Sequence, residues 1–378
     1  MNLIALKNKY WNFEGIVILS FASVFFPYYL TALIVIGLGF YILFNRNLRS
    51  LAFSKNYSVF FIAFTIYSIF IGIINLNILG ILCSLFFFLV FVVASYFKEV
   101  VNNNLYEKGL NATIFSACIV SILTIIDFLI FHKSTTRIYR ATLFFFNPNY
   151  LATLMSIVVI ICAYKVITKK GLSILYYICA CFAGVAIYLT GSLFALVEVF
   201  IGVATILLLC RRHQILSIFL LLAATFLIIL YCSPDILPRL AQADRTTENR
   251  IKIWQTSFEA IKGSPLFGKG YLTYYHNLKF YPNAYATTHA PNLILEPLLS
   301  FGVIGTALFS LFLTFYYKNV SVCKNYQSKS LISSLILAVT AAALVHATTD
   351  MTLIWIQTGF LFALILSGLG YEERLLKI

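Results

Sequence analysis

The sequence predicts an all-α polytopic membrane protein with about twelve transmembrane helices and one large external loop between the ninth and the tenth. Of its 378 residues, 61% are hydrophobic and only 11% are charged, whereas soluble domains average about 25% charged residues. Apolar segments of about 20 residues recur from end to end, and each is long enough to cross a bilayer core. A transmembrane barrel would instead show alternating segments of roughly ten residues.

The apolar segments divide the chain into three parts: residues 1–232 with helices one to nine, an external loop at 233–291, and residues 292–378 with the last three helices and a cytoplasmic tail. Within the tenth segment, Pro297 removes a hydrogen bond to the Leu293 carbonyl and predicts a kink. The twelve segments cover residues 14–26, 28–44, 57–75, 77–97, 110–131, 147–167, 172–190, 192–210, 215–232, 292–317, 330–348 and 351–369.

The net charge of +14 is explained by topology, because Lys and Arg fall mainly between apolar segments. If the N-terminus is cytoplasmic and the segments alternate, the inside ends collect most of these cations. The short outside turns near residues 27, 76, 191 and 349 then carry none, which is the positive-inside pattern. We therefore expect both termini in the cytoplasm, an uncleaved first helix and no nucleic-acid partner.

Two outside loops depart from this pattern. Residues 132–146 carry Lys133, Arg137 and Arg140, and residues 233–291 carry seven Lys or Arg. Long loops follow the rule poorly, but three cations in a short outside loop need a reason. That reason is either an anionic partner outside the membrane or contact with lipid phosphate.

The long loop contains a predicted amphipathic helix over about 248–262. Its apolar positions recur at helical spacing, Thr247 suits the N-cap, and Gly263 and Pro265 end the helix. The apolar positions are Ile251, Trp254, Phe258 and Ile261.

Tyrosines follow this helix, including Tyr274 and Tyr275. They either form an aromatic belt at the membrane surface or stack on sugar rings, and we take these two as candidate sugar contacts.

His289 stands just before a helix that begins near Pro291. The positive end of that helix is expected to lower the histidine pKa and to favour neutral imidazole. His289 is thus a candidate base, although it could simply cap the helix or contact lipid.

Ionisable residues within apolar segments are functional candidates by default. Glu198 and Asp127 lie inside such segments, and His346 and Asp350 are four residues apart, hence on one helical face. The alternative is that each is a satisfied buried polar group. The eight cysteines lie mostly within or at the ends of apolar segments and read as packing residues.

Several enzyme signatures are absent. The sequence has no Walker A motif, dinucleotide fingerprint or His-Glu-x-x-His motif. No two aspartates stand one residue apart, so we expect neither a metal nor a cofactor. An anionic leaving group must then be held by Arg or Lys, and arginine suits phosphate because its planar fork matches the oxygens.

The chain resembles the O-antigen ligase and polymerase superfamily over residues about 140 to 350. The motifs that carry the resemblance keep the family's order and spacing. They are Asn147-Pro-Asn149, Leu189-Thr-Gly-Ser192, Arg250-Ile-Lys-Ile-Trp254, Pro265-Leu-Phe-Gly268-Lys-Gly270, and Asn292 followed by Gly302 and Gly305.

Two positions depart from the family pattern. Pro291 stands directly before Asn292, where many members have His, while His289 matches the first His of the frequent His-x-His-Asn form. Leu193 stands after Ser192, where the family usually has Arg. Arg140 or Arg245 is expected to substitute for that arginine.

The resemblance implies a metal-independent, inverting glycosyltransferase at the outer face of a bacterial cytoplasmic membrane. Its donor would be an undecaprenyl-pyrophosphate-linked oligosaccharide and its acceptor a glycan or lipid-linked sugar, with membrane lipids around it. His289 would act as base, Arg140, Arg245 and Arg250 would hold the pyrophosphate, and Asn292 would also bind the substrate. Polymerase and ligase remain open alternatives, as does a flippase or ion-coupled transporter that uses Glu198, Asp127 and His346.

Overall fold

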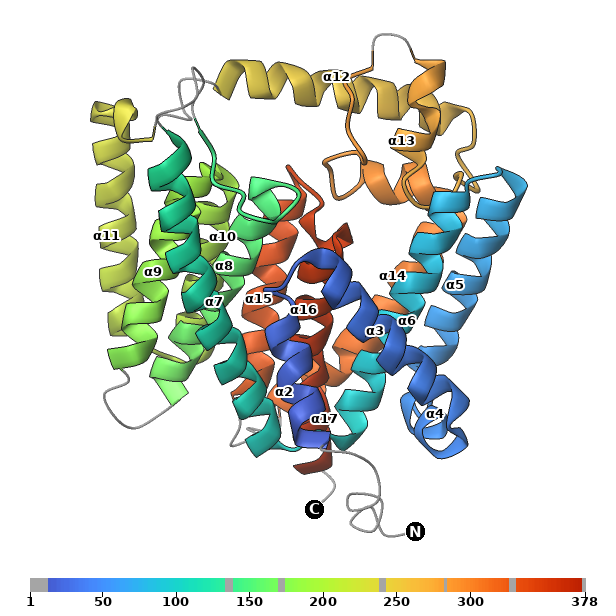
Figure 1. Cartoon of the computed structure of the whole chain (residues 1–378), viewed down its shortest axis with the longest axis horizontal. Helices are drawn as coiled ribbons and strands as arrows, with labels where there is room; N and C mark the ends of the chain where they lie inside the picture. The colour runs from blue at the N-terminus through green and yellow to red at the C-terminus, as the bar shows by residue number, and fades with distance from the viewer. Residues whose placement is uncertain are drawn as a thin grey trace.

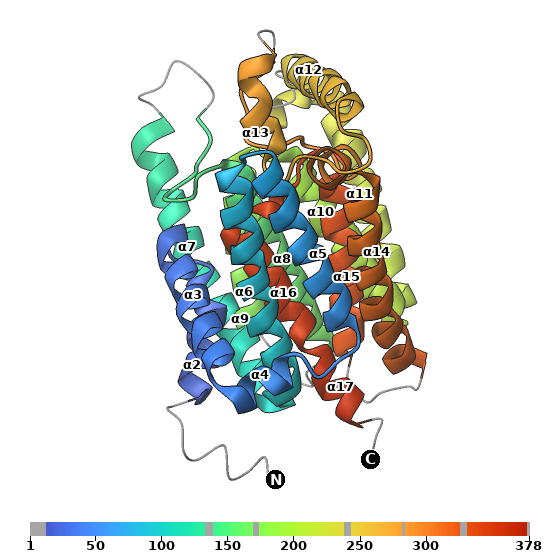
Figure 2. The ribbon, with the colours of Figure 1, turned by 90° about the vertical axis from the view of Figure 1, so that its right-hand side faces the viewer.

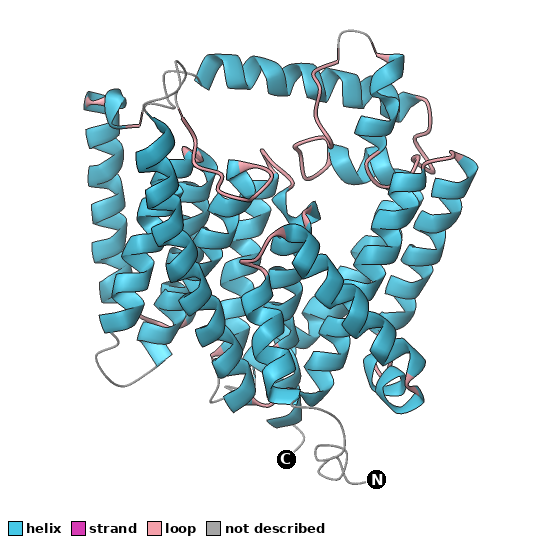
Figure 3. Ribbon diagram, viewed as in Figure 1, coloured by secondary structure: helices cyan, strands magenta, loops and turns pink. Residues whose placement is uncertain are grey.

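The computed structural model describes residues 13–132, 139–168, 174–237, 243–281, 284–325 and 331–375. Over these ranges it consists of helices and loops, with no strand (Figure 3), as the sequence predicts. The longer helices are α2 (Phe13–Ser23), α3 (Tyr28–Phe44), α5 (Tyr57–Ile74), α6 (Ile78–Val100), α7 (Asn103–Phe131), α8 (Pro148–Thr168), α9 (Ile174–Thr190), α10 (Leu193–Leu209), α11 (His213–Cys232), α12 (Ala243–Lys262), α14 (Leu295–Asn325), α15 (Ile332–Ala347) and α16 (Ile356–Ser367). The short elements are α4 (Arg46–Ala52), η2 (Pro234–Ile236), α13 (Thr273–Asn277), η4 (Leu278–Phe280), η5 (Thr352–Ile354) and α17 (Leu369–Leu375).

Each of the twelve predicted apolar segments coincides with a helix. Not every one of these helices is long enough to be counted as a membrane span. Among the described residues, six helices are long and apolar enough to cross a membrane, or up to seven if the bent pair α3 and α4 counts as one span. Four further apolar helices are shorter, at 10–17 residues. The structure therefore supports a polytopic membrane protein, while the count of twelve spans stays a prediction.

The helices stand side by side in a bundle, and α12 lies across one end of it (Figures 1 and 2). The beginning of α2 and the end of α17 lie at the opposite end (Figure 1). The amphipathic helix predicted in the long loop is thus confirmed, and the described ends of the chain share one side of the bundle. The structure contains no membrane, so which side faces outward remains a prediction.

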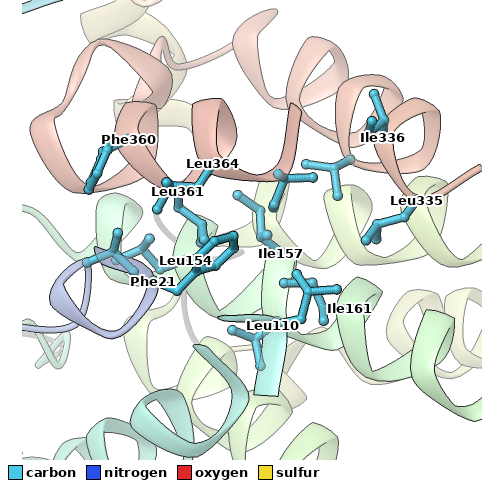
Figure 4. Packing of buried hydrophobic residues seen from close by; sticks show 14 of the residues in the cluster. Phe21, Leu110, Leu154, Ile157, Ile161, Leu335, Ile336, Phe360, Leu361 and Leu364 are labelled. Atoms are coloured by element: carbon cyan, nitrogen blue, oxygen red, sulfur yellow. The ribbon is translucent and has the colours of Figure 1, made fainter. Parts of the chain in front are cut away.

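Helix α8 is the centre of the hydrophobic core. It is apolar around its whole circumference and largely buried, as expected for a helix surrounded by others. In Figure 4 its residues Leu154, Ile157 and Ile161 meet side chains from α2, α7, α15 and α16. By contrast, α11 has no buried residue, and its exposed leucines and isoleucines suit contact with lipid.

At the end of the bundle away from α12, a buried ion pair ties α17 to α6. Lys98 is 1% exposed and its Nζ lies 2.8 Å from Glu373 Oε1. The same nitrogen lies 4.6 Å and 4.8 Å from the ring centroids of Tyr57 and Tyr316. Arg374 donates to the carbonyls of Lys98 and Glu99. These bonds satisfy the last carbonyls of α6, which have no partner within that helix.

Helix α14 is broken at Gly302, which has φ 61° and ψ −170°. The kink predicted at Pro297 is wrong. The helix begins at Leu295 rather than 292, so Pro297 lies in the first turn, where a proline has no intrahelical hydrogen bond to lose.

The break in α14 is filled by the loop that follows α12. The amides of Val303 and Ile304 donate to the carbonyls of Pro265 and Leu266, at 3.0 and 3.1 Å, and the Gly270 amide donates to the Ser300 carbonyl at 2.7 Å. Backbone groups freed by the break therefore find partners in the loop, as irregular backbone at membrane depth requires. This contact explains why Pro265-x-x-Gly268-x-Gly270 and the Gly302 motif occur together.

The predicted N-cap of α12 is wrong, and its predicted apolar face is right only in part, because Ile261 packs against the buried cluster around Tyr274. The helix starts at Ala243, so Thr247 lies inside it. Its buried residues are Ile253, Ser257 and Ala260, while Ile251 and Phe258 are 43% and 58% exposed. Small residues let α12 approach α13 and α14 closely, and the hydrophobic pattern alone could not separate that face from one turned to the membrane surface.

Candidate active site

A polar cavity of about 630 Å³ lies beneath α12, and we call it the outer cavity. Besides Arg140, Tyr275 and Leu278, it is lined by five parts of the chain. These are the start of α8, the Gly191–Phe194 turn into α10, the first half of α12, residues 285–291, and the end of α15 with Thr349 and Asp350. The motifs that carry the resemblance at 147–149, 189–192 and 250–254 thus all reach one cavity.

His289 and Asp350 form a buried pair in this cavity. His289 Nε2 lies 3.1 Å from Asp350 Oδ1, and the two residues are 6% and 8% exposed. The other ring nitrogen, Nδ1, lies 3.0 Å from Thr288 Oγ1. A carboxylate beside Nε2 favours the tautomer with its proton there, which leaves Nδ1 unprotonated and able to accept from a hydroxyl such as that of Thr288.

The electrostatics of His289 differ from the sequence-based expectation. Burial alone would lower the His289 pKa, but the hydrogen bond and the charge of Asp350, with a smaller contribution from Glu296, raise it above its ordinary value. The expected lowering by a helix end is therefore wrong, because the partner carboxylate outweighs it. Burial alone would raise the Asp350 pKa, but the hydrogen bond and the charge of His289 outweigh that effect and lower the pKa to about 2.

Arg140 is connected to the same carboxylate through one side chain. Its Nη2 donates to Asn149 Oδ1 at 2.7 Å, and Asn149 Nδ2 donates to Asp350 Oδ2 at 2.6 Å. Arg140 Nε also donates to the Thr190 carbonyl at 2.7 Å. The Asn-Pro-Asn and Thr-Gly-Ser motifs therefore hold Arg140 at the cavity wall. Asn149 connects it to Asp350, the partner of His289.

Arg250 enters the cavity from α12. Its guanidinium carbon lies 5.4 Å from the centre of the Phe194 ring, a cation–π distance. Arg140, Arg250 and His289 all line the cavity, so three of the predicted site residues are brought together.

Of the other predicted site residues, some line the outer cavity and some do not. Tyr275 lines the outer cavity, whereas Tyr274 is 2% exposed and packs under α12, with its hydroxyl donating to the Tyr285 carbonyl. Asn292 caps α14 by accepting from the amides of Ile294 and Leu295. Tyr274 and Asn292 thus support the loop rather than line the cavity. The Arg245 side chain lies outside the described residues.

Glu296 holds the His289 segment against α14. One of its oxygens accepts from the Ala290 amide at 2.7 Å, and the other accepts from Ser300 Oγ at 2.9 Å. Glu296 is 3% exposed, and both of its oxygens have partners within the protein. Its position indicates a supporting role behind His289.

The ionisable residues within the bundle also have partners. His346 Nδ1 lies 2.8 Å from Glu198 Oε2, and Tyr139 donates to Asp127 Oδ2 at 2.8 Å. Among the described residues, no group of three or more His, Cys, Asp and Glu has the arrangement of a metal site.

A second cavity, of about 640 Å³, lies behind the first, and we call it the apolar cavity. Its lining is mostly aromatic and aliphatic and comes from α5, α6, α14, α15 and α16. Ala347 and Met351 line the apolar cavity, while their neighbours His346 and Asp350 line the outer one. The turn after α15 is therefore a shared wall between the two.

Comparison with known proteins identifies a family that part of the chain resembles. Residues 177–310 fit the family model of the O-antigen ligase, and a search among curated proteins returned no match. The matched stretch runs from α9 into α14 and includes Arg250, His289 and the interlocked glycine motifs. Residues 177–310 are thus similar to the O-antigen ligase family, and the resemblance seen in the sequence is confirmed over that stretch.

Proposed function

We propose that this chain is a metal-independent, inverting glycosyltransferase that uses an undecaprenyl-pyrophosphate-linked oligosaccharide at the outer face of a bacterial cytoplasmic membrane. The match of residues 177–310 to the O-antigen ligase family supports a membrane enzyme that transfers glycans. The observation that carries the proposal is the outer cavity, in which the His289–Asp350 pair faces Arg140 and Arg250.

In this mechanism His289 is the general base. Asp350 holds the proton of neutral His289 on Nε2, so Nδ1 accepts the proton of the acceptor hydroxyl as its oxygen attacks the anomeric carbon. The bond from that carbon to the pyrophosphate oxygen breaks at the same time, and attack from the opposite face inverts the configuration. Asp350 then stabilises the imidazolium, as the raised His289 pKa indicates.

Arg140 and Arg250 bind the departing pyrophosphate. Negative charge develops on the pyrophosphate oxygen as its bond to the sugar breaks, and cations that are already in position stabilise that charge strongly. Phe194 holds the Arg250 guanidinium by its ring, and Asn149 and the Thr190 carbonyl hold that of Arg140. Neither side chain therefore has to reorganise during the reaction.

The remaining cavity walls suit the rest of the donor. Aromatic rings bind sugars through their apolar faces, and Phe146, Tyr275 and Tyr285 line the outer cavity. The apolar cavity suits the isoprenoid chain, because its lining on α6 extends from Phe87 to Lys98, which lies 11 residues further along the helix. That is roughly 16 Å of helix, about half the thickness of the bilayer core.

The transport alternative is not retained. Asp127 bonds to Tyr139, while His346 bonds to Glu198. Within the described ranges, the three residues on which transport would depend do not form one hydrogen-bonded cluster.

The test uses purified full-length protein in liposomes with an undecaprenyl-pyrophosphate oligosaccharide, and measures both product glycan and released undecaprenyl pyrophosphate. We expect His289→Ala to lower the rate by about a hundredfold to ten-thousandfold, as loss of a general base does. Arg250→Ala should lower it by about tenfold to a hundredfold, and Arg250→Lys should recover little because lysine cannot bind two oxygens in a fork. A chelator should leave the rate unchanged.

His276→Ala is the matched control, since His276 is a histidine of the same loop that does not line the outer cavity. It should keep most of the activity. A wild-type rate in folded His289→Ala protein would remove the base assignment. In cells that lack the protein, accumulated single lipid-linked units would identify a polymerase and long lipid-linked chains a ligase.

A further inference from the structure

His346 forms part of the floor of the outer cavity, although it belongs to the membrane helix α15. Its side chain is 1% exposed, and its Nδ1 is bound on the inner side by Glu198 Oε2 at 2.8 Å and by Thr153 Oγ1 at 3.2 Å. Glu198 and Thr153 are each 0% exposed. One edge of the imidazole is therefore anchored in the core.

The opposite edge of the ring has no such anchor. His346 Nε2 is buried and has no hydrogen-bond partner among the described residues. A buried nitrogen without a partner costs free energy, and native proteins usually supply a partner, water or a ligand. Because the residue lines the outer cavity, we consider this nitrogen as a contact for an anion bound there.

The Glu198 pair determines what Nε2 offers to such a ligand. With its proton on Nδ1 toward Glu198, the neutral ring leaves Nε2 without a hydrogen, whereas a second proton on Nε2 makes the ring an imidazolium that the Glu198 carboxylate stabilises. An anion bound in the outer cavity favours the imidazolium, in which Nε2 is a charged donor. The other charged groups facing His346 are Asp350 and Arg250, and Arg250 belongs to the proposed pyrophosphate site.

A sequence departure leaves room for such a donor. The family usually places Arg after the serine of the Thr-x-Ser turn, and this chain has Leu193 there. Leu193 lines the outer cavity, and it lies five residues before Glu198 on α10.

We infer that His346 is an additional ligand of the donor's pyrophosphate and takes over the role of the arginine that Leu193 replaces. The inference rests on the proposed function. Glu198 positions the ring through Nδ1, and Nε2 donates to a phosphate oxygen from the floor of the cavity while Arg140 and Arg250 bind from its walls. This histidine therefore favours the binding of diphosphates.

The test measures binding of inorganic pyrophosphate to purified full-length protein by calorimetry, in detergent at pH 7 with a chelator present. We expect His346→Gln to weaken binding about tenfold, because a neutral amide replaces a charged donor. Adding Leu193→Arg to His346→Gln should restore most of the affinity. Thr153→Val is the matched control, since Thr153 touches the inner edge of the ring but does not line the cavity, and it should leave the affinity within about twofold.

Three results would overturn the inference. His346→Gln protein could bind pyrophosphate as tightly as the wild type, Thr153→Val could weaken binding as much, or Leu193→Arg could fail to restore it. Melting temperatures of all variants show whether a loss reflects folding. If the wild type does not bind pyrophosphate, or if Arg250→Ala binds it normally, the proposed function itself fails and the inference with it.

Discussion

At the scale of single residues, the His289–Asp350 pair is the feature on which the proposed chemistry depends. The pKa of His289 is raised because Asp350 stabilises the imidazolium. A base must be neutral, so the wild-type rate should fall as the pH decreases through this raised value. Asp350→Asn removes the stabilising charge and lowers the His289 pKa, so the fall should move to lower pH.

We therefore expect Asp350→Asn to lower the rate at pH 7 by about a hundredfold or more and to shift the acid limb of its pH–rate profile downward. The profile of kcat/KM against pH measures both effects. Asp127→Asn is the control, because Asp127 is also hydrogen-bonded but does not line the outer cavity. An acid limb that stays in place in Asp350→Asn would show that Asp350 does not set the His289 pKa.

The sequence predicted some members of this site but not their connections. His289, Arg140 and Arg250 share a cavity, but the sequence suggested His346 as the neighbour of Asp350, because the two are four residues apart. Its partner is His289, which is 61 residues away, and that contact depends on how the end of α15 meets the loop. Tyr274 and Tyr275 are adjacent in sequence, yet only one lines the cavity, because neighbouring residues of a helix point about 100° apart.

At the scale of elements, the contact between the broken helix α14 and the loop after α12 fixes the lid of the cavity. Gly302 has a backbone conformation that is essentially restricted to glycine, and a Cβ there would lie 2.4 Å from the Leu266 carbonyl. Gly268 faces it, and its own Cβ would lie 2.5 Å from the Ser300 carbonyl oxygen. The two glycines thus permit the two backbones to touch.

We expect Gly302→Ala to destabilise the protein by at least about 3 kcal/mol, from strain and overpacking together, and to lower the melting temperature clearly. Tryptophan fluorescence during heating of the purified protein measures the change. Gly37→Ala is the control, because a Cβ at Gly37 on α3 meets no atom within 4 Å, and it should be neutral or slightly stabilising. Equal melting temperatures for the two variants would contradict the interlocking role.

Sequence patterns predicted where these elements lie better than how they pack. The amphipathic helix was found, but its buried face was misassigned in part, since Ser257 and Ala260 are buried by close backbone approach rather than by hydrophobicity. The break in α14 was expected in the correct helix at the wrong residue. Proline chemistry pointed to Pro297, while the cause at Gly302 is a contact with a loop more than 30 residues earlier.

At the scale of the whole molecule, the structure places α12 and the outer cavity at one end of the bundle and the beginning of α2 and the end of α17 at the other (Figure 1). Together with the distribution of Lys and Arg, this predicts that α12 lies outside the cell. In a cysteine-free background, Gln255→Cys on α12 should react with an impermeant maleimide in intact cells. Asn104→Cys, at the start of α7, should react only after permeabilisation.

Both positions are exposed in the structure, so accessibility within the protein is matched. The reverse labelling pattern would mean that the chain is inserted in the opposite orientation, with its site in the cytoplasm.

The apolar cavity has one more consequence, which concerns selectivity. A soluble protein gains free energy when an apolar chain leaves water, but a chain that enters this cavity from a bilayer leaves surroundings that are equally apolar. The hydrophobic effect then contributes almost nothing to its affinity. The aromatic walls from Phe61, Phe87 and Phe312 can discriminate only by fit, between the methyl-branched outline of an isoprenoid and the smooth outline of an acyl chain. Affinity must come from the charged head of the lipid, and recognition of its tail is a matter of shape.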